Sequence, residues 1–128
     1  MTSRLLIVDD SRAMRAFVRG SLRGFVDCEI DEASSGFEAL RLLPRTDYKM
    51  VITDINMPDI NGLELIKFVR ASERHRDVPI IIISTHSSKQ DQEKALELGA
   101  SAFLPKPFTP PEIVNVVASF IDEKGSES

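Results

Sequence analysis

Five short apolar runs recur along the chain, and segments with helical spacing separate them. The runs lie at residues 5–8, 28–33, 50–53, 79–84 and 102–104, of which 28–33 is the weakest. Runs of this length that are apolar throughout are typical of parallel strands, because both faces of a parallel sheet are buried. Strict alternation of strand and helix favours right-handed crossovers that place helices on both faces. The sequence therefore predicts an α/β, doubly wound fold around a five-stranded parallel sheet.

The segments between the runs contain recognisable helix signals. The expected helices begin near residues 11, 36, 62, 88 and 109. Ser11 is a candidate N-cap with Gly24 as the stop, and Thr109 precedes a proline at the first helical position. Gly62 is expected to serve a turn that needs positive φ.

Length and composition bound the class of protein. The 128 residues suit one domain, expected at residues 1–124 with a polar tail at 125–128. A net charge of −4 without a basic stripe argues against direct binding of nucleic acid. The single cysteine excludes an internal disulfide framework, and no apolar stretch is long enough for a membrane span. We therefore expect a cytoplasmic protein with no membrane partner.

Charged residues follow three of the apolar runs directly. The pair Asp9 and Asp10 follows the first run, Asp54 follows the third, and Lys106 follows the last, after Pro105. In open parallel sheets the ligand crevice lies outside the carboxyl ends of the strands, so these side chains are expected to converge there. Clustered carboxylates repel one another, which a bound cation would relieve, and the lysine would meet an anion that arrives later.

Magnesium suits this set of residues, with Mn²⁺ able to substitute, because it prefers hard oxygen ligands and commonly bridges to phosphate. Asp10, Asp54 and the backbone carbonyl of Asn56 can supply oxygen ligands, and Asp9 can hold a metal-bound water. A free oxygen of Asp54 can then attack a phosphoryl group to give an aspartyl phosphate. Lys106 would neutralise part of the transferring group's charge.

Two hydroxyl residues lie at the end of the fourth run. Either Ser84 or Thr85 could reach the phosphoryl oxygens, and the spacing to Lys106 favours Ser84. His75 and His86 lack metal-ligand spacing and are expected at the surface.

Four sequence blocks resemble the receiver domains of two-component response regulators, over nearly the whole chain. They are IVDDS at 7–11, ITDINMP at 52–58, NGLEL at 61–65 and FLPKPF at 103–108. The resemblance implies a flavodoxin-like sheet of order 2-1-3-4-5 and a cis bond between Lys106 and Pro107. It implies Asp54 as phosphoacceptor, Asp9 and Asp10 as the acidic metal pair, and Asn56 as donor of a backbone oxygen. It also implies a signalling switch, not a classical enzyme, that catalyses its own phosphorylation and slow dephosphorylation.

The resemblance further implies a switch in which Ser84 moves toward the phosphoryl group and Phe103 turns inward. Phe103 is equally compatible with a plain core residue. The face formed by residues 88–98, 102–104 and the last helix would then change for a downstream protein partner. The implied phosphoryl donor is a sensor histidine kinase or a phosphotransfer protein. Thr85 departs from the very small residue usual at its position, and with Asn56 and His86 it is expected to tune phosphoryl lifetime.

Two other functions remain open at this point. A magnesium-dependent phosphohydrolase could use Asp54 as nucleophile, but such enzymes usually place a second carboxylate where this chain has Asn56. An interaction domain that works without phosphorylation would have no need of buried like charges. The leading expectation is a single-domain response regulator in chemotaxis, motility or phosphorelay signalling, because the tail leaves no room for an output domain.

Overall fold

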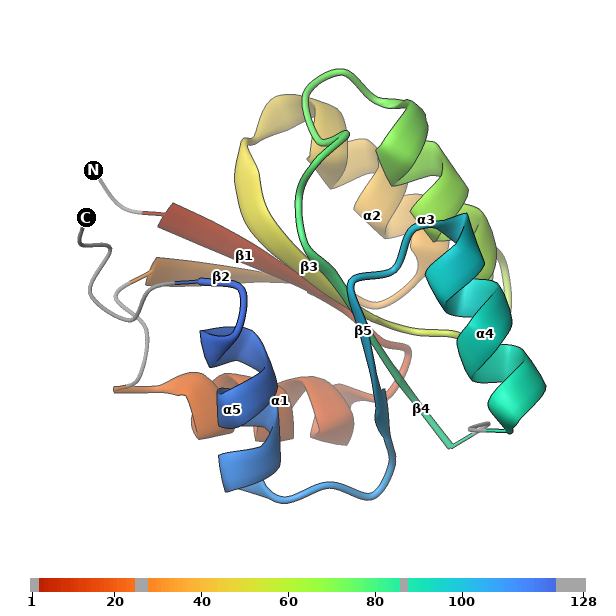
Figure 1. Ribbon diagram of the computed structural model, residues 1–128. Coiled ribbons are helices and arrows are strands. Elements are labelled where there is room, and N and C mark those ends of the chain that lie inside the picture. The colour runs from red at the N-terminus through yellow and green to blue at the C-terminus, as the bar shows by residue number, and fades with distance from the viewer. Residues whose placement is uncertain (1–2, 25–27, 86–87, 122–128) are drawn as a thin grey trace.

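The computed structural model describes residues 3–24, 28–85 and 88–121, which contain five strands alternating with five α-helices (Figure 1). The predicted tail at 125–128 and His86 lie outside the described residues. The elements in chain order are β1 (Ser3–Val8), α1 (Arg12–Leu22), β2 (Cys28–Ala33), α2 (Gly36–Leu42), the short 3₁₀ helix η1 (Leu43–Arg45), β3 (Tyr48–Asp54), α3 (Gly62–Ala71), β4 (Ile80–Ser84), α4 (Lys89–Leu98), β5 (Ala102–Pro105) and α5 (Pro110–Ala118).

The five strands form one parallel sheet in the order β2-β1-β3-β4-β5. This order confirms the predicted flavodoxin-like, doubly wound fold. The register sets Val8 beside Thr53 and Asp54 beside Ile83, so the carboxyl ends of β1, β3 and β4 lie at one edge.

Helices cover both faces of the sheet, with α1 and α5 on one and α2, α3 and α4 on the other (Figure 1). In β1, Leu5 and Ile7 pack into the cluster under α1 and α5, whereas Leu6 and Val8 pack into the opposite cluster. All four side chains are fully buried. Burial on both faces explains the continuous apolar runs in the central strands β1, β3 and β4, whereas the edge strand β2 contains Glu29, Asp31 and Glu32.

The predicted helix boundaries rest on side-chain caps. The Ser11 hydroxyl accepts a hydrogen bond from the Met14 amide at 3.1 Å, and Thr109 caps α5 in a capping box with Glu112. These bonds satisfy amides that have no partner within their helix. None of the helices in the described ranges is long and apolar enough to cross a membrane.

The prediction that Gly62 needs positive φ is wrong. Among the described residues, positive φ occurs at Gly24 and Gly99. Gly62 is instead required by close approach, because a Cβ built there would lie 2.3 Å from the Asp54 carbonyl oxygen. Its amide donates to the Ile55 carbonyl at 2.8 Å, which closes the loop that follows β3.

We expect Gly62→Ala to destabilise the protein by about 2 kcal/mol, because the added methyl group must displace the β3 backbone. Gly20 is the matched control, since nothing lies within 4 Å of a Cβ built there. Gly20→Ala should stabilise the protein by roughly 0.5–1 kcal/mol through its higher helix propensity. Urea unfolding of both variants measures the difference, and equal stabilities would contradict the packing argument.

The predicted surface position of His75 is also wrong, because its side chain is 2% exposed. Its Nε2 lies 3.2 Å from the Tyr48 amide nitrogen, which donates to it, and 3.0 Å from the Thr46 carbonyl oxygen. Burial lowers the pKa of His75, an effect that the Thr46 carbonyl partly opposes. Burial therefore favours the neutral form of the imidazole, which lies beside the start of β3.

The lowered pKa of His75 predicts a loss of stability in mild acid. As the pH falls, the unfolded chain binds the proton first, at the ordinary histidine pKa of about 6.5. The free energy of unfolding is therefore constant above that pH with respect to His75, and it decreases below that pH until the lower pKa of the folded protein is passed. Each pH unit in this window removes up to about 1.4 kcal/mol. We expect His75→Gln to remove this part of the dependence. Unfolding free energies measured between pH 7.5 and 5.5 test this, and parallel curves for both proteins would contradict it.

Candidate functional site

Three carboxylates converge at the carboxyl edge of the sheet. Asp9 and Asp10 follow β1, and Asp54 is the last residue of the neighbouring strand β3. Each of the three offers an oxygen, and these oxygens all lie within 4.8 Å of one another. Asp9 is fully buried, Asp54 is 7% exposed and Asp10 is exposed. The predicted convergence is therefore present, with one open side at Asp10.

Lys106 reaches this cluster from the end of β5. Its Nζ lies 3.1 Å from Asp9 Oδ2 and 3.2 Å from Asp54 Oδ2, so the ammonium bridges two of the carboxylates. The Lys106 amide donates to the Ser84 carbonyl at 2.8 Å, which anchors the lysine to the end of β4. The peptide bond between Lys106 and Pro107 is cis, as the resemblance implied. The predicted convergence of Lys106 with the carboxylates is therefore present, and the lysine pairs with Asp9 and Asp54 themselves, whereas the sequence analysis assigned it to an incoming anion.

Asp9 is the most deeply buried acid of the cluster. Burial raises its pKa, and the repulsion from Asp54 adds to this effect. The Ser11 amide, which donates to Asp9 Oδ1 at 2.9 Å, and the Lys106 ammonium both act in the opposite direction without cancelling it. Ionised Asp9 is therefore incompletely stabilised by its surroundings, and a cation at the cluster would compensate.

The oxygens at this edge fit a hard divalent cation. Carboxylate oxygens from Asp9, Asp10 and Asp54 are ligands that Mg²⁺ prefers, and the exposure of Asp10 leaves room for the waters that it keeps. Within the described residues, this is the one group of three or more neighbouring acidic, histidine or cysteine side chains that could hold a metal ion.

The other predicted site residues lie around this cluster at different depths. Ser84 is fully buried at the end of β4, and its neighbour Thr85 is exposed. The Asn56 amide lies 3.4 Å from Asp54 Oδ1, and its side chain is exposed. Phe103 pairs with Ile82 in the register of β4 and β5 and is half-buried against the cluster under α2, α3 and α4. His86 lies outside the described residues.

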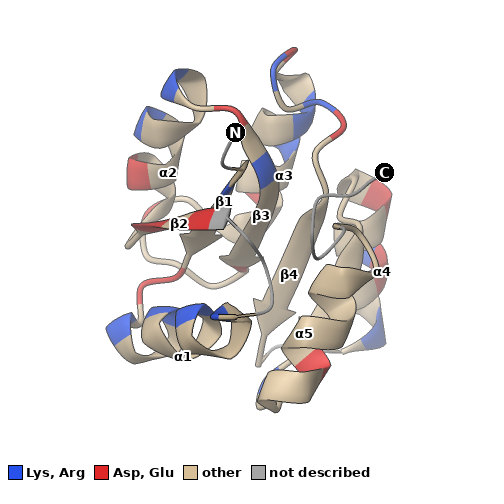
Figure 2. Ribbon diagram, turned by 90° about the vertical axis from the view of Figure 1, so that its left-hand side faces the viewer, with Lys and Arg blue, Asp and Glu red and all other residues tan. Residues whose placement is uncertain are grey.

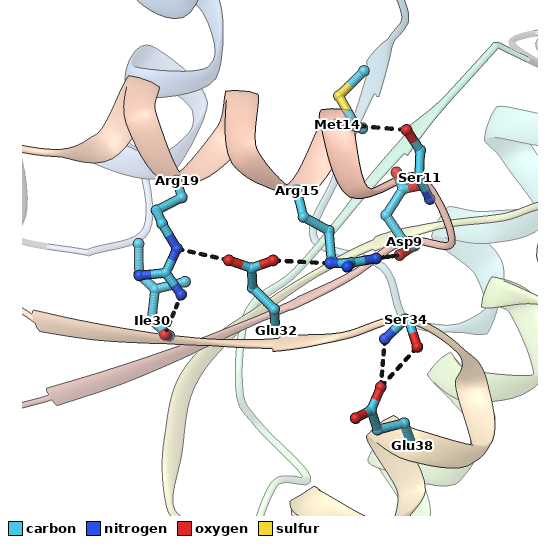
Figure 3. A network of polar contacts seen from close by, with 9 residues as sticks. All are labelled: Asp9, Ser11, Met14, Arg15, Arg19, Ile30, Glu32, Ser34 and Glu38. Carbon is cyan, nitrogen blue, oxygen red and sulfur yellow. Dashed lines mark hydrogen bonds and ion pairs between the residues drawn. The ribbon is translucent and has the colours of Figure 1, made fainter.

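One contact at the site was missed by the sequence analysis. Figure 2 shows basic residues on α1 beside acidic residues on β2, and Figure 3 shows that Arg15 donates both to Glu32 and to the backbone of Asp9. The available signal was a pair of arginines one helical turn apart at 15 and 19, which reads as an ordinary solvated helix face. Their acidic partner on β2 becomes evident only once the helix is packed.

Comparison with known proteins places these features in one family. A family model of the response regulator receiver domain matches residues 5–118. The chemotaxis protein CheY homolog of Campylobacter jejuni is 44% identical over 108 residues, which are 84% of this chain and 83% of that protein. The structure of the chemotaxis response regulator CheY4 of Vibrio cholerae has a TM-score of 0.87 at 29% identity, covering 94% of this chain and 100% of that chain.

A third similar protein is the receiver domain of the sensor histidine kinase PA1611 from Pseudomonas aeruginosa PAO1. Its structure has a magnesium ion coordinated in the active site cleft, and the TM-score is 0.83 at 25% identity, covering 94% of this chain and 98% of that chain. The family match spans most of the sequence, and the strand order agrees with the fold that the sequence predicted. This chain therefore belongs to the response regulator receiver domain family.

Proposed function

We propose that Asp54 accepts a phosphoryl group from a phosphohistidine on a sensor histidine kinase or a phosphotransfer protein. The observation that carries the proposal is the convergence of Asp54 with Asp9, Asp10 and Lys106 at the open edge of the sheet. In the transfer, a carboxylate oxygen of Asp54 forms a bond to phosphorus while the bond from phosphorus to the histidine nitrogen breaks, and the imidazole keeps the electron pair.

The surrounding residues divide the charge of the reaction among them. Asp9, Asp10, Asp54 and the backbone carbonyl of Asn56 would hold Mg²⁺, or Mn²⁺ in its place. The bound ion would neutralise phosphoryl oxygens and orient them. The Lys106 ammonium, already 3.2 Å from Asp54 Oδ2, is placed to pair with another phosphoryl oxygen. The magnesium in the similar PA1611 receiver domain supports this assignment.

Phosphorylation would act as a switch on the face formed by α4, β5 and α5. Ser84 is buried next to the site, and its carbonyl is bonded to Lys106 at the end of β5. Movement of the Ser84 hydroxyl toward a phosphoryl oxygen would free space that the half-buried Phe103 can fill. The two packings would differ in shape at β5, and a downstream protein would bind one of them preferentially. The chemotaxis relatives support a partner in motility signalling.

Two alternatives rank lower on specific observations. A phosphohydrolase would need a second carboxylate as general acid at position 56, where this chain has an exposed asparagine. An interaction domain that works without phosphorylation gains nothing from Asp9. Burial raises the pKa of Asp9, and the hydrogen bonds and the charge of Lys106 do not fully offset this effect.

We expect acetyl phosphate to add one phosphoryl group to the wild-type protein only when Mg²⁺ is present, because the carboxylate cluster needs a cation before it can approach an anion. Intact-mass spectrometry measures the adduct. Asp54→Asn should abolish the adduct, whereas Asp59→Asn should not. Asp59 is a suitable control because it is an acid in the loop that follows Asp54, where it accepts hydrogen bonds from the α2 amides of Gly36 and Phe37.

Other outcomes of this experiment separate the competing functions. Release of phosphate over many turnovers would favour the hydrolase. Absence of both the adduct and magnesium binding would favour the interaction domain.

We further propose that Asn56, Thr85 and His86 set the lifetime of the phosphoryl group. Thr85 is exposed beside the buried Ser84, so its branched side chain can limit the approach of water. Thr85→Ala should therefore speed phosphoryl loss by about threefold or more, roughly 0.7 kcal/mol of activation free energy. Phosphate release from the phosphorylated protein measures this, with His86→Glu in parallel. Unchanged rates in both variants would exclude this proposal.

A further inference from the structure

A partly buried ion-pair network joins α1 to β2 next to the carboxylate cluster (Figure 3). Arg15 and Arg19 lie one helical turn apart on α1, and Glu32 on β2 lies between them. Arg15 Nε donates to Glu32 Oε1 at 2.8 Å, and Arg19 Nε donates to Glu32 Oε2 at 2.7 Å. The Arg15 side chain is 13% exposed and that of Arg19 is 40% exposed. Arg15 is thus the deeper member of the pair.

The two arginines differ in their second hydrogen bond. Arg15 Nη1 donates to the backbone carbonyl of Asp9 at 2.7 Å, whereas Arg19 Nη2 donates to the carbonyl of Ile30 at 2.8 Å. Both arginines therefore share one carboxylate, but only Arg15 contacts the carboxylate cluster. Arg19 is a natural control for any effect of the shared ion pair.

The Asp9 carbonyl belongs to the peptide group that joins Asp9 to Asp10. A peptide group is planar, so a restraint on its oxygen fixes the direction in which the chain enters Asp10. Asp9 has further restraints, because its amide donates to the Ala33 carbonyl at 3.1 Å and its side chain bonds Ser11 and Lys106. Asp10 is exposed, and within the described part of the chain its carboxylate has no hydrogen bond or ion pair. Its position depends on the backbone.

We infer that Arg15 is a positioning residue for the cation site: held by Glu32, it fixes the peptide between Asp9 and Asp10 and thereby the direction of the Asp10 carboxylate. This inference rests on the proposed function, because it assumes that the carboxylates bind Mg²⁺. A preset Asp10 removes part of the ordering that cation binding would otherwise require.

Charge alone makes the opposite prediction. A guanidinium near the site repels a divalent cation, so if Arg15 acted only through its charge, its removal would tighten Mg²⁺ binding. If Arg15 acts by positioning, its removal weakens Mg²⁺ binding although a positive charge is lost. The direction of the change therefore separates the two roles.

The test is a magnesium titration of the full chain followed by amide NMR shifts. Arg15→Met should raise the Kd for Mg²⁺ roughly tenfold, the lower end for loss of an outer-shell partner. Arg19→Met should change it by less than about twofold. In the metal-free proteins, Arg15→Met should move the Asp10 amide resonance and Arg19→Met should not. Arg15→Lys, which keeps one donor but not the planar pair, should recover part of the affinity.

The outcomes are distinguishable. Unchanged or tighter binding in Arg15→Met, or equal weakening in Arg15→Met and Arg19→Met, would overturn the inference while the proposed function stands. Absence of magnesium binding in the wild-type protein would overturn the proposed function and the inference together. If Arg15→Met does not fold, Arg15→Lys compared with Arg19→Lys makes the same decision.

Discussion

The parallel pairing of β1 with β3 is the constraint on which the site depends. Their register sets Val8 beside Thr53, so the residues that follow, Asp9 and Asp54, emerge level with each other at the sheet edge. Two ionised carboxylates whose oxygens lie within 4.8 Å of each other repel, and burial strengthens the repulsion. The fold stabilises the arrangement with the Lys106 ammonium, which bonds both. The register of β1 and β3 therefore places two like charges together, and this explains why the site needs a cationic partner.

The surroundings of the site are rigid where the carboxylates need support. The loop after β3 is closed by Gly62, which packs directly on the Asp54 backbone, and Asp59 in the same loop accepts from the amides of Gly36 and Phe37 at the start of α2. On the other side, the Ser11 amide and the Arg15 guanidinium bond Asp9. Side chains on the open side, at Asp10, Asn56 and Thr85, are exposed. The site therefore combines a hydrogen-bonded interior with one side that is exposed to solvent.

The strand ends and most helix starts could be predicted from the sequence, because parallel strands need continuous apolar runs and caps need particular side chains. Asp9, Asp54 and Lys106 were found for this reason. His75 could not be placed, since its burial depends on the approach of Tyr48, the first residue of β3, to the loop after α3. The presence of glycine at position 62 was predicted for the wrong reason, because both a close approach of two backbone segments and a positive φ require glycine. The contact of Arg15 with Asp9 arises from helix packing, which sequence spacing does not reveal.

Lys106 contacts both the carboxylate cluster, through its side chain, and the end of β4, through its backbone. Its ammonium serves Asp9 and Asp54 together, so under the proposed function a phosphoryl group on Asp54 would draw it away from Asp9. Asp9, fully buried and with a raised pKa, would then need the cation more strongly, which couples metal binding to phosphorylation. The Lys106 amide is also bonded to the Ser84 carbonyl, so any shift of the lysine backbone acts on the ends of both β4 and β5. Under the proposed function, a change of charge at Asp54 would reach the α4-β5-α5 face through the ends of these two strands.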